Sequence, residues 1–183
     1  MAVLVLSMLT AAPTAASNTL SQQVLCPGTP ALTARVLGQN QPDGKPHVTF
    51  QAYGQRHSDA YVTLVVSDST CRGNGWNVTL QALSLSFKGT GGAALTPRDL
   101  TLVSVGSPAA VTGSQSIGVT GGPLAVNQLG TMDRTRKVIR AAPKFGLGTY
   151  TQRLSLRLSF PNTKAKGTYT ATVVVTAATG PGS

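Results

Sequence analysis

The residue types that most often carry catalysis are scarce in this chain. It has 183 residues, no glutamate, and only five aspartates, which are Asp43, Asp59, Asp68, Asp99 and Asp133. General acid–base catalysis and glycoside hydrolysis need paired carboxyl groups, and scattered aspartates offer no such pair. His47 and His57 have no cysteine nearby and form no metal-binding motif, and no nucleophile elbow or phosphate loop is present. The sequence therefore predicts a protein that is not an enzyme and uses neither metal nor cofactor.

Basic residues supply the remaining chemical signal. The chain carries 15 lysines and arginines against 5 acidic residues, a net charge of +10, and such a field attracts polyanions. Arg153 and Arg157 share the outward face of one predicted strand, and if that strand lies beside the preceding basic segment, one positive patch results. The alternative is a solvated basic surface that keeps the protein soluble. The residues predicted to bind a polyanion are Arg134, Arg136, Lys137, Arg140, Lys144, Arg153 and Arg157.

The N-terminal residues bear on where the protein is found. Residues 2–12 form an apolar run too short to span a bilayer as a helix, and small residues suited to signal-peptidase cleavage follow. We predict a signal peptide over residues 1–16, although no basic residue precedes the apolar run. The alternative is a buried N-terminal strand. Residues 17–30, which contain Pro27 and Pro30, are predicted to be a tether leading into the domain.

Export to an oxidising compartment is consistent with a disulfide between the two cysteines. It also limits the expected polyanion to components of the cell envelope. Cys26 and Cys71 both follow the predicted leader, and a pair of cysteines in an oxidising compartment favours one disulfide. The alternative is two independent buried thiols. We expect a bacterial protein at the cell surface or wall, without a transmembrane span in its mature form. Its expected partner is peptidoglycan or an anionic envelope polymer, together with other surface proteins, rather than nucleic acid.

The elements that must position these residues are strands. Threonine, serine, valine and glycine fill the polar and turn positions, which is typical of an all-β protein. Residues 47–53 alternate with Val48, Phe50 and Ala52 on one face, and residues 59–66 are a second strand. Asp68 then precedes a turn, where an aspartate typically bonds to the backbone two residues on.

The strand that starts at Trp76 contains a change of phase. Trp76, Val78, Leu80 and Ala82 share one face, but Leu83, Leu85 and Phe87 follow the opposite parity. A strand with period two keeps both sets inside only with a bulge or a bend near Ala82–Leu83. Trp76 itself, the only tryptophan, is predicted to anchor the core rather than to stack on a ligand.

The C-terminal third has the most regular alternation. Residues 150–160 and 169–176 each present one apolar face, which predicts an antiparallel pair covering a second sheet, and hence a single-domain antiparallel β-sandwich. The middle of the chain, residues 89–134, contains short possible strands at 100–105 and 116–119.

Several segments together resemble one protein family. Ser67-Asp68 precedes Gly73-Asn74-Gly75-Trp76-Asn77-Val78, and later come Gly146 to Tyr150, Phe160-Pro161 and Gly167 to Thr170, which includes Tyr169. In this order and spacing they resemble the WxL domain, a β-rich module of bacterial surface proteins that adheres to cell walls. The resemblance covers residues 31–181 and implies a wall-associated sandwich.

The chain departs from that family at two points. Val78 stands where the family's name motif has leucine, and Val174-Val175-Thr176-Ala177 stands where a second tryptophan motif is expected. Both motifs are implicated in peptidoglycan attachment in the family, so the chain resembles a divergent member with one tryptophan. The alternative function is a structural subunit of a surface layer or fibre that assembles through strand edges.

Overall fold

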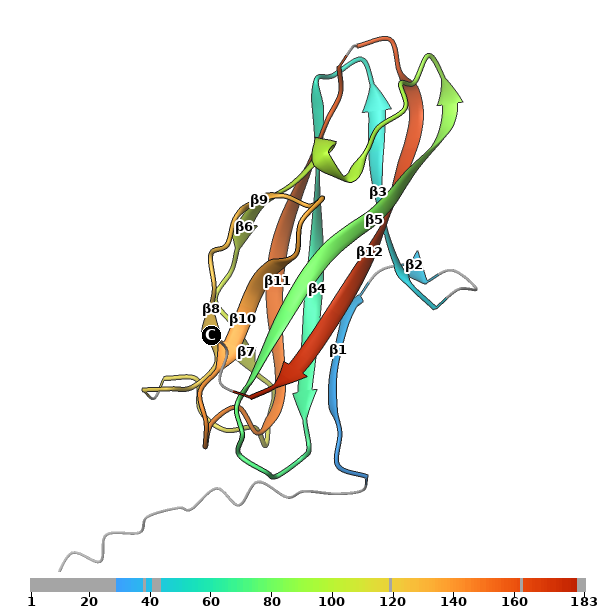
Figure 1. Cartoon of the computed structure of the whole chain (residues 1–183). Coiled ribbons are helices and arrows are strands. Elements are labelled where there is room, and N and C mark those ends of the chain that lie inside the picture. The colour runs from blue at the N-terminus through green and yellow to red at the C-terminus, as the bar shows by residue number, and fades with distance from the viewer. Residues whose placement is uncertain (1–28, 38, 41–43, 119, 162, 181–183) are drawn as a thin grey trace, which may run out of the picture.

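The protein is a sandwich of two antiparallel sheets (Figure 1), in agreement with the fold expected from the sequence. The computed structural model describes residues 29–37, 39–40, 44–118, 120–161 and 163–180. The predicted signal peptide 1–16, most of the tether 17–30, and Cys26 lie outside these residues. Among the described residues, none belongs to a helix of the length and apolarity that a membrane crossing requires.

In the described part of the chain, each sheet contains six strands. The first sheet has the order β1 (Leu32–Leu37), β4 (His57–Asp68), β11 (Gly148–Ser159), β6 (Leu100–Val105) and β9 (Gly130–Thr131), with β7 (Ala109–Ala110) also paired to β11. The second has the order β2 (Gln39–Asn40), β3 (Pro46–Tyr53), β12 (Lys166–Thr179), β5 (Trp76–Thr90), β10 (Arg136–Ala141) and β8 (Leu124–Ala125). One 3-10 turn, Pro97–Asp99, precedes β6.

The core lies between the two inner faces, and the period-two alternation of the sequence builds it. Val48, Phe50 and Ala52 of β3 are buried as predicted. Leu154, Leu156 and Leu158 of β11 contribute to the same core from the other sheet and are 0% exposed. Burial of one apolar face per strand is the force that brings the sheets together.

The predicted change of phase in β5 is a β-bulge. Thr172 of β12 pairs with Ser84, but the next residue, Val173, pairs with Ala82, so Leu83 is the additional residue. Leu83 is 48% exposed. The bulge returns Leu85 to the core side, which confirms the prediction made from the parity of the sequence.

The prediction that the last two long strands pair with each other is wrong. β11 lies in the first sheet between β4 and β6, whereas β12 lies in the second between β3 and β5. The connecting segment crosses between the layers, and Phe160, which opens it, stacks on Tyr169 with ring centroids 5.4 Å apart. Both strands bury their apolar faces by packing across the sandwich. The alternating sequence pattern is the same for this arrangement as for two strands paired in one sheet.

The middle of the chain has fewer regular strands than expected. β6 confirms the strand predicted at residues 100–105. Residues 116–118 contain bends rather than a strand, and residue 119 lies outside the described residues. Short strands form instead at β7, β8 and β9, which cover the edges of the two sheets.

Candidate functional site

Trp76 organises the end of the sandwich at which β5 begins and β12 ends, the lower end in Figure 1. Its side chain is 0% exposed. The indole Nε1 donates a 2.9 Å hydrogen bond to the Gly146 carbonyl, and its ring centroid lies 6.0 Å from that of Tyr150. These contacts confirm Trp76 as a core anchor, because its single donor is satisfied inside the protein.

Two glycines allow the loops to close around the indole. Gly146 has φ +86°, and a Cβ atom there would lie 2.5 Å from Trp76 Nε1. Gly75 has φ +71°, and its Cβ would lie 2.6 Å from the Ala141 carbonyl oxygen. Both positions therefore require glycine for conformation and for space. The first and second segments that resemble the WxL domain thus pack directly against each other.

The polar groups around Trp76 hold the loops in place. Asp68 is buried, and its Oδ1 accepts bonds from the Thr70 amide at 2.9 Å and the Thr70 hydroxyl at 2.7 Å. This is the turn-capping role predicted for Asp68. The Tyr150 hydroxyl lies 2.8 Å from the Leu147 carbonyl oxygen and 3.0 Å from that of Gln115.

Burial, with a smaller contribution from the charge of Asp68, raises the pKa of Tyr150 to about 12, although the bond to Gln115 works in the opposite direction. We therefore expect Tyr150 to ionise in the folded protein only near that pH. A raised folded pKa stabilises the fold fully below about pH 10, the usual tyrosine pKa, and this contribution is lost as the pH rises toward about 12.

Ultraviolet titration of tyrosinate, paired with unfolding at each pH, checks this expectation. Tyr150→Phe should remove the late phase of the titration and flatten the alkaline loss of stability. Ionisation of Tyr150 near pH 10 in the native protein would contradict the buried, bonded hydroxyl.

Three exposed basic residues surround this end, and we call them the Trp-end cluster: Arg72, Arg140 and Lys144. The Lys144 amide donates a 2.7 Å bond to the Gly73 carbonyl, which places Lys144 next to the loop that holds Arg72. Arg140 lies on β10 opposite Asn77, one residue from Trp76. Within the described part of the chain, no carboxylate pairs with any of these three side chains.

The cluster contains two of the basic residues predicted from sequence and one that the prediction missed. Arg72 stands alone in the sequence, far from the basic segment, and only the packing of its loop against residues 141–146 brings it close to Lys144. Its position directly before the Gly73-Asn74-Gly75 turn was the one signal that pointed to it.

The remaining predicted residues lie elsewhere, and the condition for one positive patch, that the two basic segments lie side by side, is not met. Arg140 projects from the outer face of the second sheet, whereas Arg153 and Arg157 project from the outer face of the first. Because β10 and β11 belong to different layers, these two groups face opposite sides of the molecule. Arg134 is exposed in the turn before β10.

Several of these side chains have partners within the protein. Arg136 donates from Nε to the Thr131 carbonyl at 2.9 Å and from Nη1 to that of Leu129 at 3.2 Å. The Arg153 guanidinium lies 4.1 Å from the ring centroid of Tyr61. Lys137 is half-buried on β10 and also has an interaction partner.

Arg157 forms an ion pair with Asp59. Its Nε and Nη2 donate to the two carboxylate oxygens of Asp59 at 2.7 and 2.8 Å. This hydrogen bonding lowers the pKa of the Asp59 carboxyl and raises the pKa of Arg157. The charge of Arg157 is therefore already balanced.

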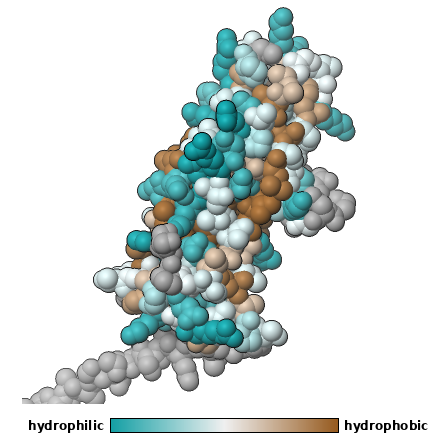
Figure 2. All heavy atoms as spheres, in the orientation of Figure 1, coloured by the Kyte–Doolittle hydropathy of each residue, from teal (hydrophilic) through white to brown (hydrophobic). Residues whose placement is uncertain are grey.

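A second basic region lies at the opposite end of the sandwich. Lys88 of β5 and Lys166 of β12 are exposed there, and Lys164 precedes β12. Figure 2 shows hydrophilic side chains at both ends of the molecule and apolar ones along the middle of the face that carries β12. The end with Trp76 contains the first two of the four motif segments, and the end with Lys88 and Lys166 contains the other two, Phe160-Pro161 and Gly167 to Thr170.

The other motif residues are structural. Val78 is 0% exposed and pairs with Ile139 of β10. Tyr169 is 1% exposed, and its hydroxyl donates a 2.9 Å bond to the Ala93 carbonyl. The residues described here contain no group of three or more histidine, cysteine or acidic side chains placed to hold a metal ion. Comparisons with protein-family models, curated proteins and solved structures gave no match.

Proposed function

We propose that this chain is a secreted, non-enzymatic bacterial protein that attaches to the cell wall by binding an anionic wall polymer with its Trp-end cluster. The observation that supports this proposal is the convergence of Arg72, Arg140 and Lys144 around two of the four segments that resemble the WxL domain. Peptidoglycan itself is the other wall component that this end of the sandwich would contact.

The physical basis is charge held on a rigid support. The loops that present Arg72 and Lys144 are joined by a backbone hydrogen bond and rest on a buried indole. Fewer conformations are therefore lost on binding than with mobile loops. Three exposed cations that have no carboxylate partner in the described part of the chain attract a polyanion at long range.

Sedimentation with purified cell wall across a salt gradient tests the proposal. Exposed charges are screened beyond about 8 Å at physiological ionic strength and beyond about 3 Å at 1 M. Binding should therefore be strong at low salt and largely lost at high salt. Walls stripped of their anionic polymer should no longer bind the protein. Equal binding to stripped and intact walls would contradict the anionic ligand and favour peptidoglycan.

If the protein is secreted, as proposed, we expect a disulfide between Cys26 and Cys71. Cys71 lies in the exposed loop after Asp68, whereas Cys26 lies outside the described residues, so the pairing stays a prediction. Closing such a long loop would stabilise the fold by about 4 kcal/mol in the chain-entropy model. Thiol titration of the unfolded, unreduced protein should find no free thiol. Two free thiols would refute the pairing.

A further inference from the structure

The sandwich has an open side where β1 and β12 approach each other. β1 is the edge strand of the first sheet, and among the strands that the structure describes it pairs with β4 alone. β12 pairs with β3 from Lys166 to Thr172, but it continues along β5 as far as Thr179. Among the described residues, no strand pairs with the edge of residues 173–179 that β3 leaves uncovered.

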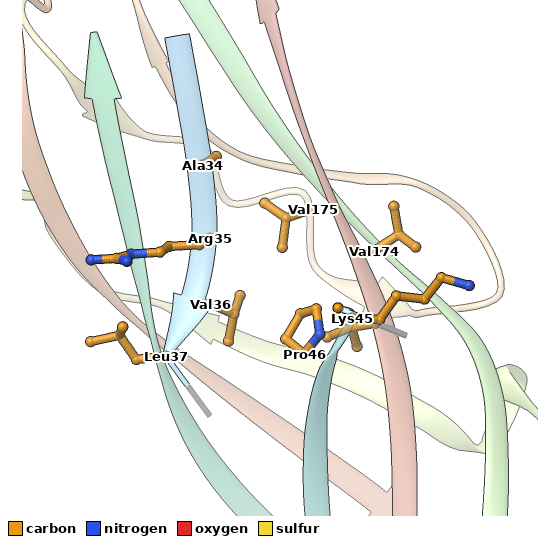
Figure 3. A pocket seen from close by; sticks show the side chains of 10 residues that line it. Ala34, Arg35, Val36, Leu37, Lys45, Pro46, Val174 and Val175 are labelled. Carbon is orange, nitrogen blue, oxygen red and sulfur yellow. The ribbon is translucent and has the colours of Figure 1, made fainter. Parts of the chain in front are cut away.

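A groove of about 500 Å³ lies between these two edges. Figure 3 shows Val36, Pro46 and Val175 pointing into it, while Arg35 and Leu37 point away toward the outer face of the first sheet. Lys45 points away on the other side. The side chains that point into the groove are therefore apolar, and the basic side chains of its lining point away from it.

The open edge of β12 has the composition of a strand that pairs readily. Residues 173–179 read Val-Val-Val-Thr-Ala-Ala-Thr, without charge, proline or glycine. Natural proteins usually protect open edges with charged residues, prolines or bulges, because unpaired backbone groups recruit other strands. This edge carries none of those protections within β12 itself.

We propose that the groove binds an extended strand of a partner protein whose apolar residues alternate with at least one acidic residue. A strand laid between the free edge of β1 and the open edge of β12 would place alternate side chains against Val36 in the groove. The intervening side chains would lie on the outer face, one of them directly across from Arg35. This is recognition by β-strand addition, with the backbone providing affinity and the alternate side chains providing specificity.

Charge favours a partner strand with an acidic residue over two other possible occupants of the groove, which are a second copy of this chain and residues 17–28 of the same chain. Arg35 lies opposite Val65 of β4, and its side chain has no carboxylate partner among the described residues. A second copy of the chain would also carry a charge of +10 and be repelled. Residues 17–28 of the same chain contain no acidic residue. The proposed interaction goes beyond wall binding and does not depend on it.

The test uses the full chain and a synthetic peptide in which valine alternates with threonine and one central threonine is replaced by aspartate. Calorimetry should show saturable one-to-one binding. Hydrogen exchange should show those amides of residues 173–179 that point away from β5 slowed at least about tenfold when the peptide is bound, as expected for newly paired amides. A peptide with proline in place of one central valine should not bind, because proline removes a backbone donor.

A charge exchange tests the role of Arg35. Replacing the peptide aspartate by lysine should weaken binding about two- to fivefold, the usual range for a cross-strand charge pair. Arg35→Glu should reverse that preference, and the matched control Arg134→Glu, at an exposed turn, should leave it unchanged. No saturable binding by either peptide, or a preference unaffected by Arg35→Glu, would overturn the proposal.

Two further outcomes would also overturn it by assigning another occupant. If only a chain lacking residues 17–28 binds the peptide, the N-terminal segment occupies the groove. If the amides of residues 173–179 become protected with rising protein concentration alone, a second copy occupies it.

Discussion

Replacing Trp76 with alanine is expected to lower the free energy of unfolding by about 3–5 kcal/mol, the range for large aromatic truncations in cores. The indole is fully buried, packs beside Tyr150 and donates to the Gly146 carbonyl. Its removal leaves a cavity and an unpaired carbonyl at the point where two loops meet. Urea unfolding, followed by circular dichroism, measures the change.

Trp76→Phe is the matched control. It keeps an aromatic ring in the core and removes the donor to Gly146, so its cost should be smaller than that of alanine. In the parent protein, the fluorescence of Trp76 should be blue-shifted and resistant to iodide. A loss below about 1 kcal/mol for the alanine variant, typical of surface sites, would contradict the anchoring role.

Gly167→Ala is expected to destabilise the fold by about 2–5 kcal/mol, from overpacking together with backbone strain. Gly167 and Gly89 lie directly opposite each other on β12 and β5. Gly167 has φ +156°, and a Cβ atom there would lie 2.3 Å from the Lys88 carbonyl oxygen. Because that neighbour is backbone in a paired strand, it cannot move aside without breaking the sheet. Urea unfolding again measures the loss.

Gly113→Ala separates the two contributions. Gly113 also has positive φ, +85°, but a Cβ atom there would meet nothing within 4 Å. That variant should therefore show only the conformational cost, about 1–2 kcal/mol. Equal losses at Gly113 and Gly167 would mean that the close approach of β5 and β12 is not what selects glycine at position 167.

The sequence predicted the features that depend on one strand at a time. Parity alone predicted a bulge or a bend near Ala82–Leu83, and the shared face of Trp76 and Val78 predicted burial of the indole. The same alternation does not say which strand lies beside which. Residues 150–160 and 169–176 bury identical faces whether they pair in one sheet or pack across two, so their placement in different sheets could not be predicted from periodicity.

The composition of the candidate site depends on which strands lie side by side, and the alternation of the sequence does not determine this. Arg140 and Arg153 are close in sequence, and their separation onto opposite faces follows only from the assignment of β10 and β11 to different sheets. Arg72 joins Lys144 through the hydrogen bond between the Lys144 amide and the Gly73 carbonyl. A contact between residues so far apart in sequence leaves no local pattern to recognise.

Charge reversal at the two basic ends tests the central proposal most directly. One variant changes Arg72, Arg140 and Lys144 to glutamate, and the matched control changes Lys88, Lys164 and Lys166. Both alter the net charge equally, and all six side chains are exposed, so little change in melting temperature is expected.

The measurement is the dissociation constant of each variant for purified cell wall at low salt. A basic residue near an anionic surface contributes about 1 kcal/mol, so the first variant should bind roughly a hundredfold more weakly than the parent. The control should retain most of its affinity. Equal losses in both variants would show that net charge alone drives binding, and unchanged affinity in the first would contradict the Trp-end cluster as the wall-binding site.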